Sequence, residues 1–238
     1  MKKILILACV FSVISANLHA QTAGQFSIGA RFGAAMGFNN PSGFQNEMRT
    51  WLGAGVQNFN DFVDQPSVNF NFAGTVNYAV TNWFSLQVEL NFMVSQGYDL
   101  SFSPTAFAPG QRSRELDVDY HSIDIPLLFR LNLFGITGSP NAFGIQAGPH
   151  ISIPIGRADI YDDTHDGYLG RFEISTAVTF GFTAGIFAGI PLGPGQVVGD
   201  LRFIFDTNAV ELNFYHGGNV RFMERRALLF TVGYEISL

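Results

Sequence analysis

Lysine is almost absent from this sequence of 238 residues, and charged side chains of any kind are scarce. Both lysines lie at the start of the chain, and charged residues make up 13% of the whole, against about a quarter in a typical soluble domain. Phenylalanine (25 residues) and glycine (26 residues) are abundant instead. A surface of this composition would be poorly soluble in water, and the lack of a basic stripe argues against nucleic-acid binding.

Cysteine is equally rare, since Cys9 is the only one. It lies in an N-terminal segment with two lysines, an apolar run and small residues up to Ala20, which is typical of a secretory signal peptide. We therefore predict a signal peptide over residues 1–20 and a mature domain over residues 21–238. A lipoprotein acylated at Cys9 is the alternative, but apolar residues continue beyond that position.

The predicted mature chain has a simple chemistry. It would contain no cysteine, which excludes disulfides and a thiol nucleophile. Its 11 arginines and 19 acidic residues give a net charge of 11 − 19 = −8. No run of eighteen apolar residues follows the signal segment, so no transmembrane helix is expected.

Eight segments instead alternate apolar and polar residues with period two, which is the pattern of β-strands that separate two environments. In the clearest one, the even-numbered residues from Phe84 to Val94 form an apolar face. The odd-numbered residues between them, including Glu89, form the opposite face. The segments lie near residues 26–38, 68–80, 84–95, 118–133, 143–153, 172–186, 197–206 and 228–238. In the fourth segment the phase changes, which predicts a β-bulge near His121.

The connections between these segments alternate between long and short, which is the arrangement of an outer-membrane barrel. Only helices and closed barrels satisfy every backbone group in lipid. We therefore predict an all-β fold: an eight-stranded antiparallel transmembrane β-barrel, an up-and-down meander with long extracellular loops and short periplasmic turns. The first long connection, residues 39–66, has some helical spacing and is expected to be either a short amphipathic helix or an irregular loop.

A soluble eight-stranded barrel with an apolar interior would show the same alternation. The polar face distinguishes the two. It consists mostly of Gly, Ser, Ala, Asn and Thr, which are too small and too uncharged for a solvated exterior but suit a narrow barrel interior. Glycines that recur every fourth residue, such as Gly29, Gly33 and Gly37, are expected to make room for bulky side chains across the lumen.

The polar face also includes a set of charged residues that we predict to face the lumen. Buried charges need partners, and three cations with four anions could form a paired network. The network could close the barrel as a structural staple, or it could line a narrow polar path or ligand site. Its predicted members are Arg31, Glu89, Asp124, Arg130, Asp200, Arg202 and Glu235.

No catalytic, cofactor or metal site is expected. The histidines lack the spacing of a zinc site. Some outer-membrane barrels are lipid hydrolases with a Ser/His pair, and His121 and Ser122 are adjacent here. Adjacent residues on a strand face opposite sides, however, so these two would not form a catalytic pair.

Two short motifs resemble a known family. The segment Ile123-Asp124-Ile125-Pro126-Leu127-Leu128-Phe129-Arg130 and the following Ala147-Gly148-Pro149-His150 are similar to strands of the outer membrane protein beta-barrel domain family, the PorT-like barrels of Bacteroidota. The resemblance implies an outer-membrane location, and one family member supports protein secretion. Prolines are unusual inside a ladder, so we expect bulges beside Pro126 and Pro149.

The end of the chain resembles the signal that the barrel-assembly machinery reads. Four residues match its pattern in register: Thr231, Gly233, Ile236 and Leu238. The usual last residue is Phe, so Leu238 departs from the pattern. The resemblance implies that the assembly machinery is a partner during insertion.

From these observations we expect an integral protein of the cell outer membrane with a structural or surface-interaction role through its extracellular loops. The alternatives are a narrow solute channel, a component of a protein-secretion apparatus and, less favoured, an outer-membrane lipid hydrolase. No enzyme activity and no cofactor are expected. The expected partners are outer-membrane lipid, the assembly machinery and surface or secretion partners of unknown identity.

Overall fold

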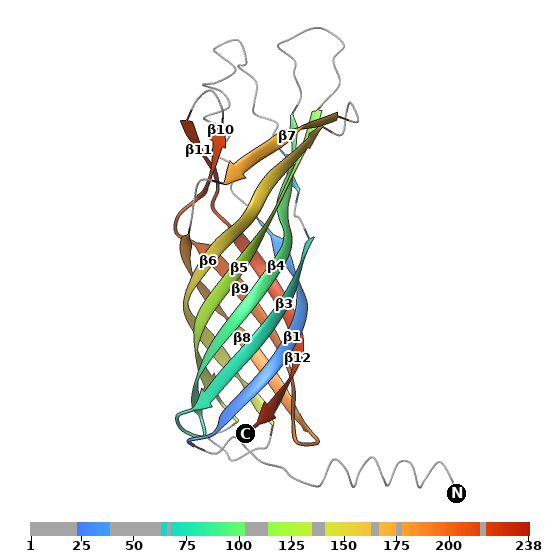
Figure 1. Ribbon diagram of the computed structural model, residues 1–238. Coiled ribbons are helices and arrows are strands. Elements are labelled where there is room, and N and C mark those ends of the chain that lie inside the picture. Colours follow the sequence, from blue (N-terminus) through green and yellow to red (C-terminus); the bar gives the residue numbers. More distant parts are fainter. Residues whose placement is uncertain are drawn as a thin grey trace, which may run out of the picture.

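The computed structural model describes residues 23–38, 63–65, 68–102, 114–134, 141–162, 167–174, 178–214 and 218–238 (Figure 1). The described residues form twelve strands: β1 (Phe26–Gly37), β2 (Val63–Gln65), β3 (Val68–Ala79), β4 (Phe84–Phe102), β5 (Arg114–Asn132), β6 (Ala142–Asp162), β7 (Gly167–Ile174), β8 (Thr179–Leu192), β9 (Gly195–Asp206), β10 (Val210–Phe214), β11 (Gly218–Met223) and β12 (Arg226–Ser237). Among these residues there is no helix of the length and apolar character that a membrane span requires.

Eight of these strands form a closed ring. Going round it, β1, β3, β4, β5, β6, β8, β9 and β12 each pair antiparallel with the next, and β12 pairs with β1. Closure leaves the ring without a free edge, so backbone groups within the membrane find partners in neighbouring strands. The predicted all-β, eight-stranded antiparallel barrel is confirmed.

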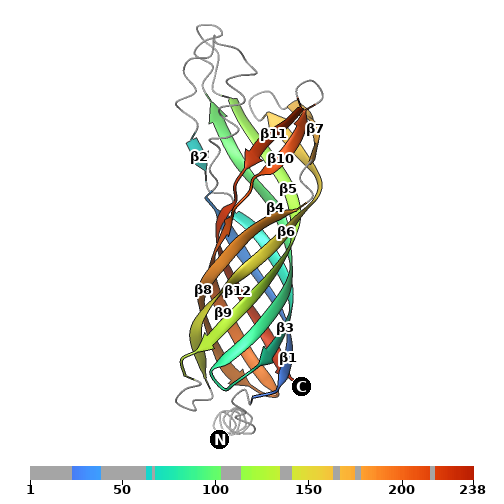
Figure 2. The ribbon, with the colours of Figure 1, turned by 90° about the vertical axis from the view of Figure 1, so that its left-hand side faces the viewer.

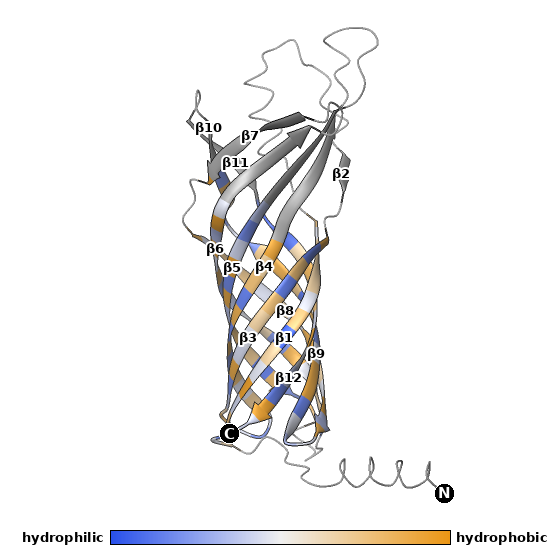
Figure 3. Cartoon of the chain, turned by 45° about the vertical axis from the view of Figure 1, so that its right-hand side comes forward, coloured by the Kyte–Doolittle hydropathy of each residue, from blue (hydrophilic) through white to orange (hydrophobic). Residues whose placement is uncertain are grey.

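The wall separates two environments residue by residue. In β3, exposed and buried positions alternate along the whole strand. The outward residues are large and apolar: Phe32 is 64% exposed and Phe182 is 61% exposed. The inward residues are polar, and Asn71 and Gln87 are both 0% exposed. Apolar residues outside and polar residues inside are the reverse of the distribution in a soluble protein, and they suit a wall between lipid and a filled lumen. Figure 3 shows hydrophobic residues alternating with hydrophilic ones along the strands.

The strands β4, β5 and β6 continue well beyond the ring at the end with long connections (Figures 1 and 2). They contain 19, 19 and 21 residues, and the short strands β2, β7, β10 and β11 extend the sheet they form at that end. We call this part the outer sheet. Side-chain alternation predicts shorter strands, because it marks only the part of each strand that has one apolar face.

The outer sheet also corrects two expectations. The predicted sixth segment, residues 172–186, is two elements, because β7 ends at Ile174 and pairs with the outer part of β6, whereas β8 begins at Thr179. The two pieces share the same odd-even alternation, which concealed the break. The long connection of residues 39–66 contains the strand β2, which pairs with β4; its other residues lie outside the described part of the chain.

The irregularities of the ladder agree with the sequence at one place and not at another. The register shifts between Asp119 and His121, so the bulge predicted near His121 is confirmed. The bulges expected beside the prolines are wrong. Pro126 pairs with His150 in the same register as the residues that follow, and Pro149 pairs with Phe182 without a shift. A proline removes only one backbone donor, and the ladder keeps its register around that loss.

Candidate functional site: the charged lumen

Six of the seven charged residues predicted to face the lumen lie together inside the ring. Strand alternation turns each of them inward, because its neighbours along the strand are apolar and face lipid. They come from five strands, only some of which are neighbours in the ring, so the barrel brings together residues far apart in sequence. We call them the central charge group: Arg31, Glu89, Arg130, Asp200, Arg202 and Glu235, all at least 97% buried.

Arg31 is at the centre of this group. Its guanidinium forms ion pairs with Glu89 (3.1 Å), Asp200 and Glu235, which come from three other strands. It also donates a hydrogen bond to Oε1 of Gln87 at 3.1 Å. One side chain on β1 therefore connects β4, β9 and β12 across the lumen.

The other two arginines complete the network. Arg202 pairs with Glu89 at 2.6 Å and with Asp200 at 2.7 Å. Arg130 pairs with Glu235 at 3.4 Å, and its guanidinium lies 4.0 Å from the centroid of the Phe187 ring. Three cations thus balance three carboxylates, which is what a buried ionic group requires to be tolerated.

Asp124, the seventh predicted residue, belongs to a second group nearer the outer end. Its carboxylate pairs with Arg225 at 2.7 Å, and Arg225 also pairs with Asp206 at 3.2 Å. Nε2 of His150 lies 2.6 Å from the Asp206 carboxylate. We call these four residues the outer charge group; all are at least 97% buried.

Sequence reasoning missed most of the outer charge group. His150 and Asp206 were on predicted inward faces but were not assigned to the network. Arg225 lies before the point where the eighth segment was expected to begin. It has the same odd-numbered alternation as Thr231 and the buried Leu229, so extending the pattern by a few residues would have turned it inward.

An apolar layer separates the two charge groups. Along the inward positions of β9, Ile204 lies between Arg202 and Asp206, and buried residues of other strands contact it at this level. The layer consists of Ala35, Met93, Ile204, Ala227 and Leu229. The lumen is therefore filled by two ionic groups with a hydrophobic layer between them.

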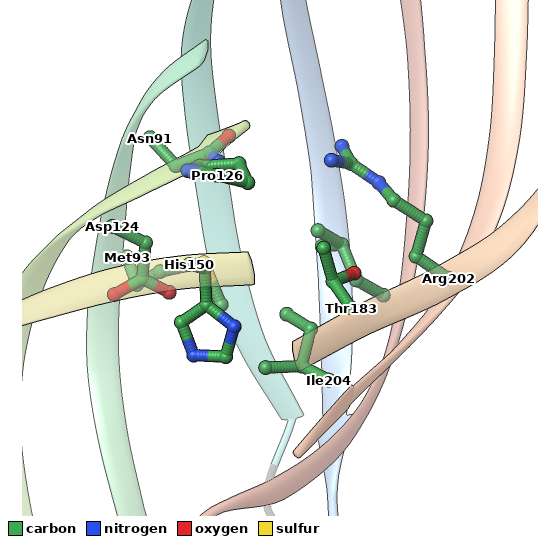
Figure 4. Close-up of a pocket in the computed structure, with 9 residues that line it drawn as sticks. Asn91, Met93, Asp124, Pro126, His150, Thr183, Arg202 and Ile204 are labelled. Atoms are coloured by element: carbon green, nitrogen blue, oxygen red, sulfur yellow. The ribbon is translucent and has the colours of Figure 1, made fainter. Parts of the chain in front are cut away.

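A small cavity lies beside this layer (Figure 4). Its volume is about 10 Å³, which is room for one water molecule. Nine residues line it: Asn91, Met93, Asp124, Pro126, His150, Thr183, Arg202, Ile204 and Leu229. A void of this size is far too small for a nutrient or a metabolite.

The sequence matches the family described as outer membrane protein beta-barrel domain over residues 19–237. The chain belongs to this family. It is accordingly an integral protein of the outer membrane, with the apolar wall of the ring in the lipid bilayer. No curated protein is similar enough in sequence to count as a relative.

Among solved structures, the chain is similar to outer-membrane proteins of low sequence identity. The outer membrane protein OprG from Pseudomonas aeruginosa matches with a TM-score of 0.54 at 9% identity, covering 91% of this chain and 97% of that chain. The outer membrane protein AlkL matches at 15% identity, covering 94% of both chains with a TM-score of 0.47. Ail of Yersinia pestis matches at 10% identity, covering 90% of this chain and 100% of that chain, with a TM-score of 0.40. At these identities, the likeness to OprG is one of fold alone.

Two of the inward glycines, Gly33 and Gly185, serve a different purpose from the one expected. A Cβ atom on Gly33 would lie 2.0 Å from the carbonyl oxygen of Phe230, and one on Gly185 would lie 2.1 Å from that of Leu201. Both obstacles are backbone atoms of the adjacent strand. The glycines therefore allow close approach of neighbouring backbones, and the expectation that they make room for side chains across the lumen is wrong at these positions.

The lumen shows no arrangement suited to catalysis among the described residues. Ser122 is buried in the lumen whereas His121 is exposed on the opposite face. His150 has a carboxylate partner, but its Nδ1 atom has no hydrogen-bond partner within the described part of the chain, so no serine completes a triad there. No cluster of His, Cys, Asp and Glu in the described part could hold a metal ion.

The four residues of the predicted assembly signal occupy both faces of β12. Thr231 is buried and donates a hydrogen bond to Asp200 at 2.8 Å, and Gly233 lies against the side chain of Arg31. Ile236 and Leu238 face outward and are 40% and 72% exposed. Recognition by the assembly machinery stays a prediction, and Thr231 and Gly233 have a second role in supporting the central charge group.

Proposed function

We propose that this protein is a sealed barrel that acts at the cell surface through its outer sheet and loops. The observation that supports the proposal is the filled lumen. The central charge group pairs three cations with three carboxylates, and the apolar layer above it leaves a cavity of about 10 Å³. Transport of a solute would require several buried ion pairs to break at once, and each is costly to break.

If the barrel is sealed, the outer sheet is the part of the described chain that would be available to partners outside the cell. It is built on β4, β5 and β6, and the strands β7, β10 and β11 widen it away from the ring. Binding residues are disproportionately found on such extensions, which a rigid scaffold positions. A structural or surface-interaction role therefore fits the architecture better than a channel, and no observation favours a lipid hydrolase.

The finer identity is part of the same proposal. The segment from Ile123 to Arg130 resembles the PorT-like barrels of Bacteroidota, which suggests membership of that subgroup and leaves a secretion-apparatus component as the second candidate. We also propose that residues 1–20 are a cleaved signal peptide and that the barrel-assembly machinery inserts the mature domain. No enzymatic activity is proposed.

Site-specific photocrosslinking in intact cells tests the surface role. A crosslinking amino acid at His121, which is exposed where β5 enters the outer sheet, should capture a partner, and one at Pro194 in the periplasmic turn between β8 and β9 should not. Leu90, on the lipid face, is the matched control. Capture from Pro194 alone would favour a secretion component instead, and capture from neither position under conditions of full expression would contradict a role through partners.

A further inference from the structure

The lipid-facing side of β1, β3, β8, β9 and β12 contains a single formally charged residue, Arg226. Alternation on β12 shows its direction: Ala227 is buried at 1% exposure, whereas Leu228 is exposed to lipid. Arg226 therefore points outward, unlike Arg225, which belongs to the outer charge group. A permanently charged guanidinium on a lipid-facing wall requires an explanation.

One aromatic ring contacts the Arg226 side chain, and a second aromatic residue lies beside its backbone. Arg226 pairs with Phe205 across the ladder, and its guanidinium carbon lies 5.4 Å from the centroid of the Phe205 ring. On the other side the backbone N–H of Phe38 donates to the carbonyl oxygen of Arg226 at 2.6 Å, and Phe38 is exposed on the same face. A cation over a ring face is attracted by the ring's quadrupole, so the guanidinium is positioned before any ligand arrives.

The height of Arg226 on the barrel points to the headgroups of the outer leaflet. Tyr234, at the periplasmic rim, donates its hydroxyl to the carbonyl of Leu192. Arg226 lies eight positions before Tyr234 on β12 and toward the outer end. Eight residues at about 3.3 Å each, tilted by about 40°, span roughly 20 Å, which approaches the roughly 25 Å of a barrel's apolar band.

The charge of Arg226 is not neutralised by the described part of the protein. Each arginine in the two charge groups has a carboxylate partner, but Arg226 forms no ion pair with any described residue. Glu224 lies two positions nearer the water and does not pair with it. A guanidinium matches a phosphate group with two parallel hydrogen bonds, better than an ammonium does.

We propose that Arg226, stacked on Phe205 beside Phe38, binds a phosphate group of an outer-leaflet lipid. The site would fix the height and rotation of the barrel in the membrane at one strand. The ligand is a lipid rather than free phosphate, because the guanidinium lies over the Phe205 ring on the lipid-facing side of the wall, where Phe38 is also exposed.

Lipid binding to the purified full-length protein in detergent tests this proposal, with native mass spectrometry as the readout. The probes are lipid A, a diglucosamine lipid with two phosphates, and its dephosphorylated form. We expect Arg226→Gln to weaken lipid A binding roughly tenfold, the loss of one charge-assisted hydrogen-bonded contact, and Arg226→Lys to weaken it less. Dephosphorylated lipid should bind the wild type as poorly as lipid A binds Arg226→Gln.

His121→Gln is the matched control. His121 is exposed on β5, the strand opposite β12 in the ring, and this variant should bind lipid A as the wild type does. Equal binding of lipid A by the wild type and Arg226→Gln would overturn the proposal. Competition by inorganic phosphate that matches competition by lipid A would also overturn it. So would a loss of thermal stability by Arg226→Gln that is the same in lipid-free detergent as with lipid, because it would assign the guanidinium to a partner within the protein.

Discussion

Glu89 has no exposed surface and has two arginine partners, Arg31 and Arg202, from different strands. Its inward direction was predictable from its apolar neighbours Val88 and Leu90. Its partners were not, because the stagger between strands, which decides which residues lie at the same level, leaves no trace in the alternation. The same limit explains why Asp124 was grouped with residues that it does not contact.

Replacing Glu89 with alanine should strongly destabilise the barrel. Arg31 and Arg202 would lose a carboxylate in a dry interior, and breaking a buried pair in this way costs about 3–5 kcal/mol. Denaturant unfolding of the refolded protein, followed by tryptophan fluorescence, measures the change. Glu224→Ala is the control, because Glu224 is partly exposed and makes no ion pair with the described residues; it should cost at most about 1 kcal/mol. Equal small effects would contradict the paired lumen.

Glycine substitutions on adjacent strands should have opposite effects. Gly33→Ala places a Cβ atom 2.0 Å from the carbonyl oxygen of Phe230, so the backbone must move, at a cost of about 1–3 kcal/mol. Gly74→Ala meets nothing within 4 Å and should be neutral or stabilising by up to about 1 kcal/mol. Urea unfolding in detergent compares the two variants. A harmless Gly33→Ala would mean that β1 and β12 approach less closely than described.

At the scale of elements, the sequence predicts strands well where one face is apolar. The ring portions of all eight strands lie within a few residues of the alternating segments. The outer sheet was not predictable in this way, because it lies beyond the wall of the ring, where no division between lipid and lumen imposes the alternation. Residues 172–186 illustrate the failure, since Ile174 and Phe180 have the same parity although they belong to β7 and β8.

The pairing of β6 with β8, two strands separated in sequence by β7, can be tested with cysteines. Ala147 on β6 and Ala184 on β8 are direct Cα partners. Cysteines at these two positions should form a disulfide on oxidation, visible as a gel shift that a reductant reverses. Cysteines at Ala147 and Ala188 should not, because four positions along a strand separate them by about 13 Å, beyond the roughly 7 Å limit for a disulfide. The reverse result would place β8 in another register.

At the scale of the whole molecule, composition and periodicity sufficed to predict a membrane barrel, because so few charges and so many outward phenylalanines suit only a lipid-facing wall. They could not show whether the lumen is open. That property depends on side chains from four or more strands meeting at one level. The central charge group and the apolar layer are products of the closed fold, and both fill the space through which a solute would pass.

Single-channel recording in planar lipid bilayers tests the sealed lumen most directly. The purified, refolded, heat-modifiable protein should insert without giving a steady conductance, because buried ion pairs and an apolar layer occupy the lumen and the cavity beside that layer is about 10 Å³. Large, stable and reproducible current steps from the wild-type protein would contradict the account and would show that the lumen is a channel.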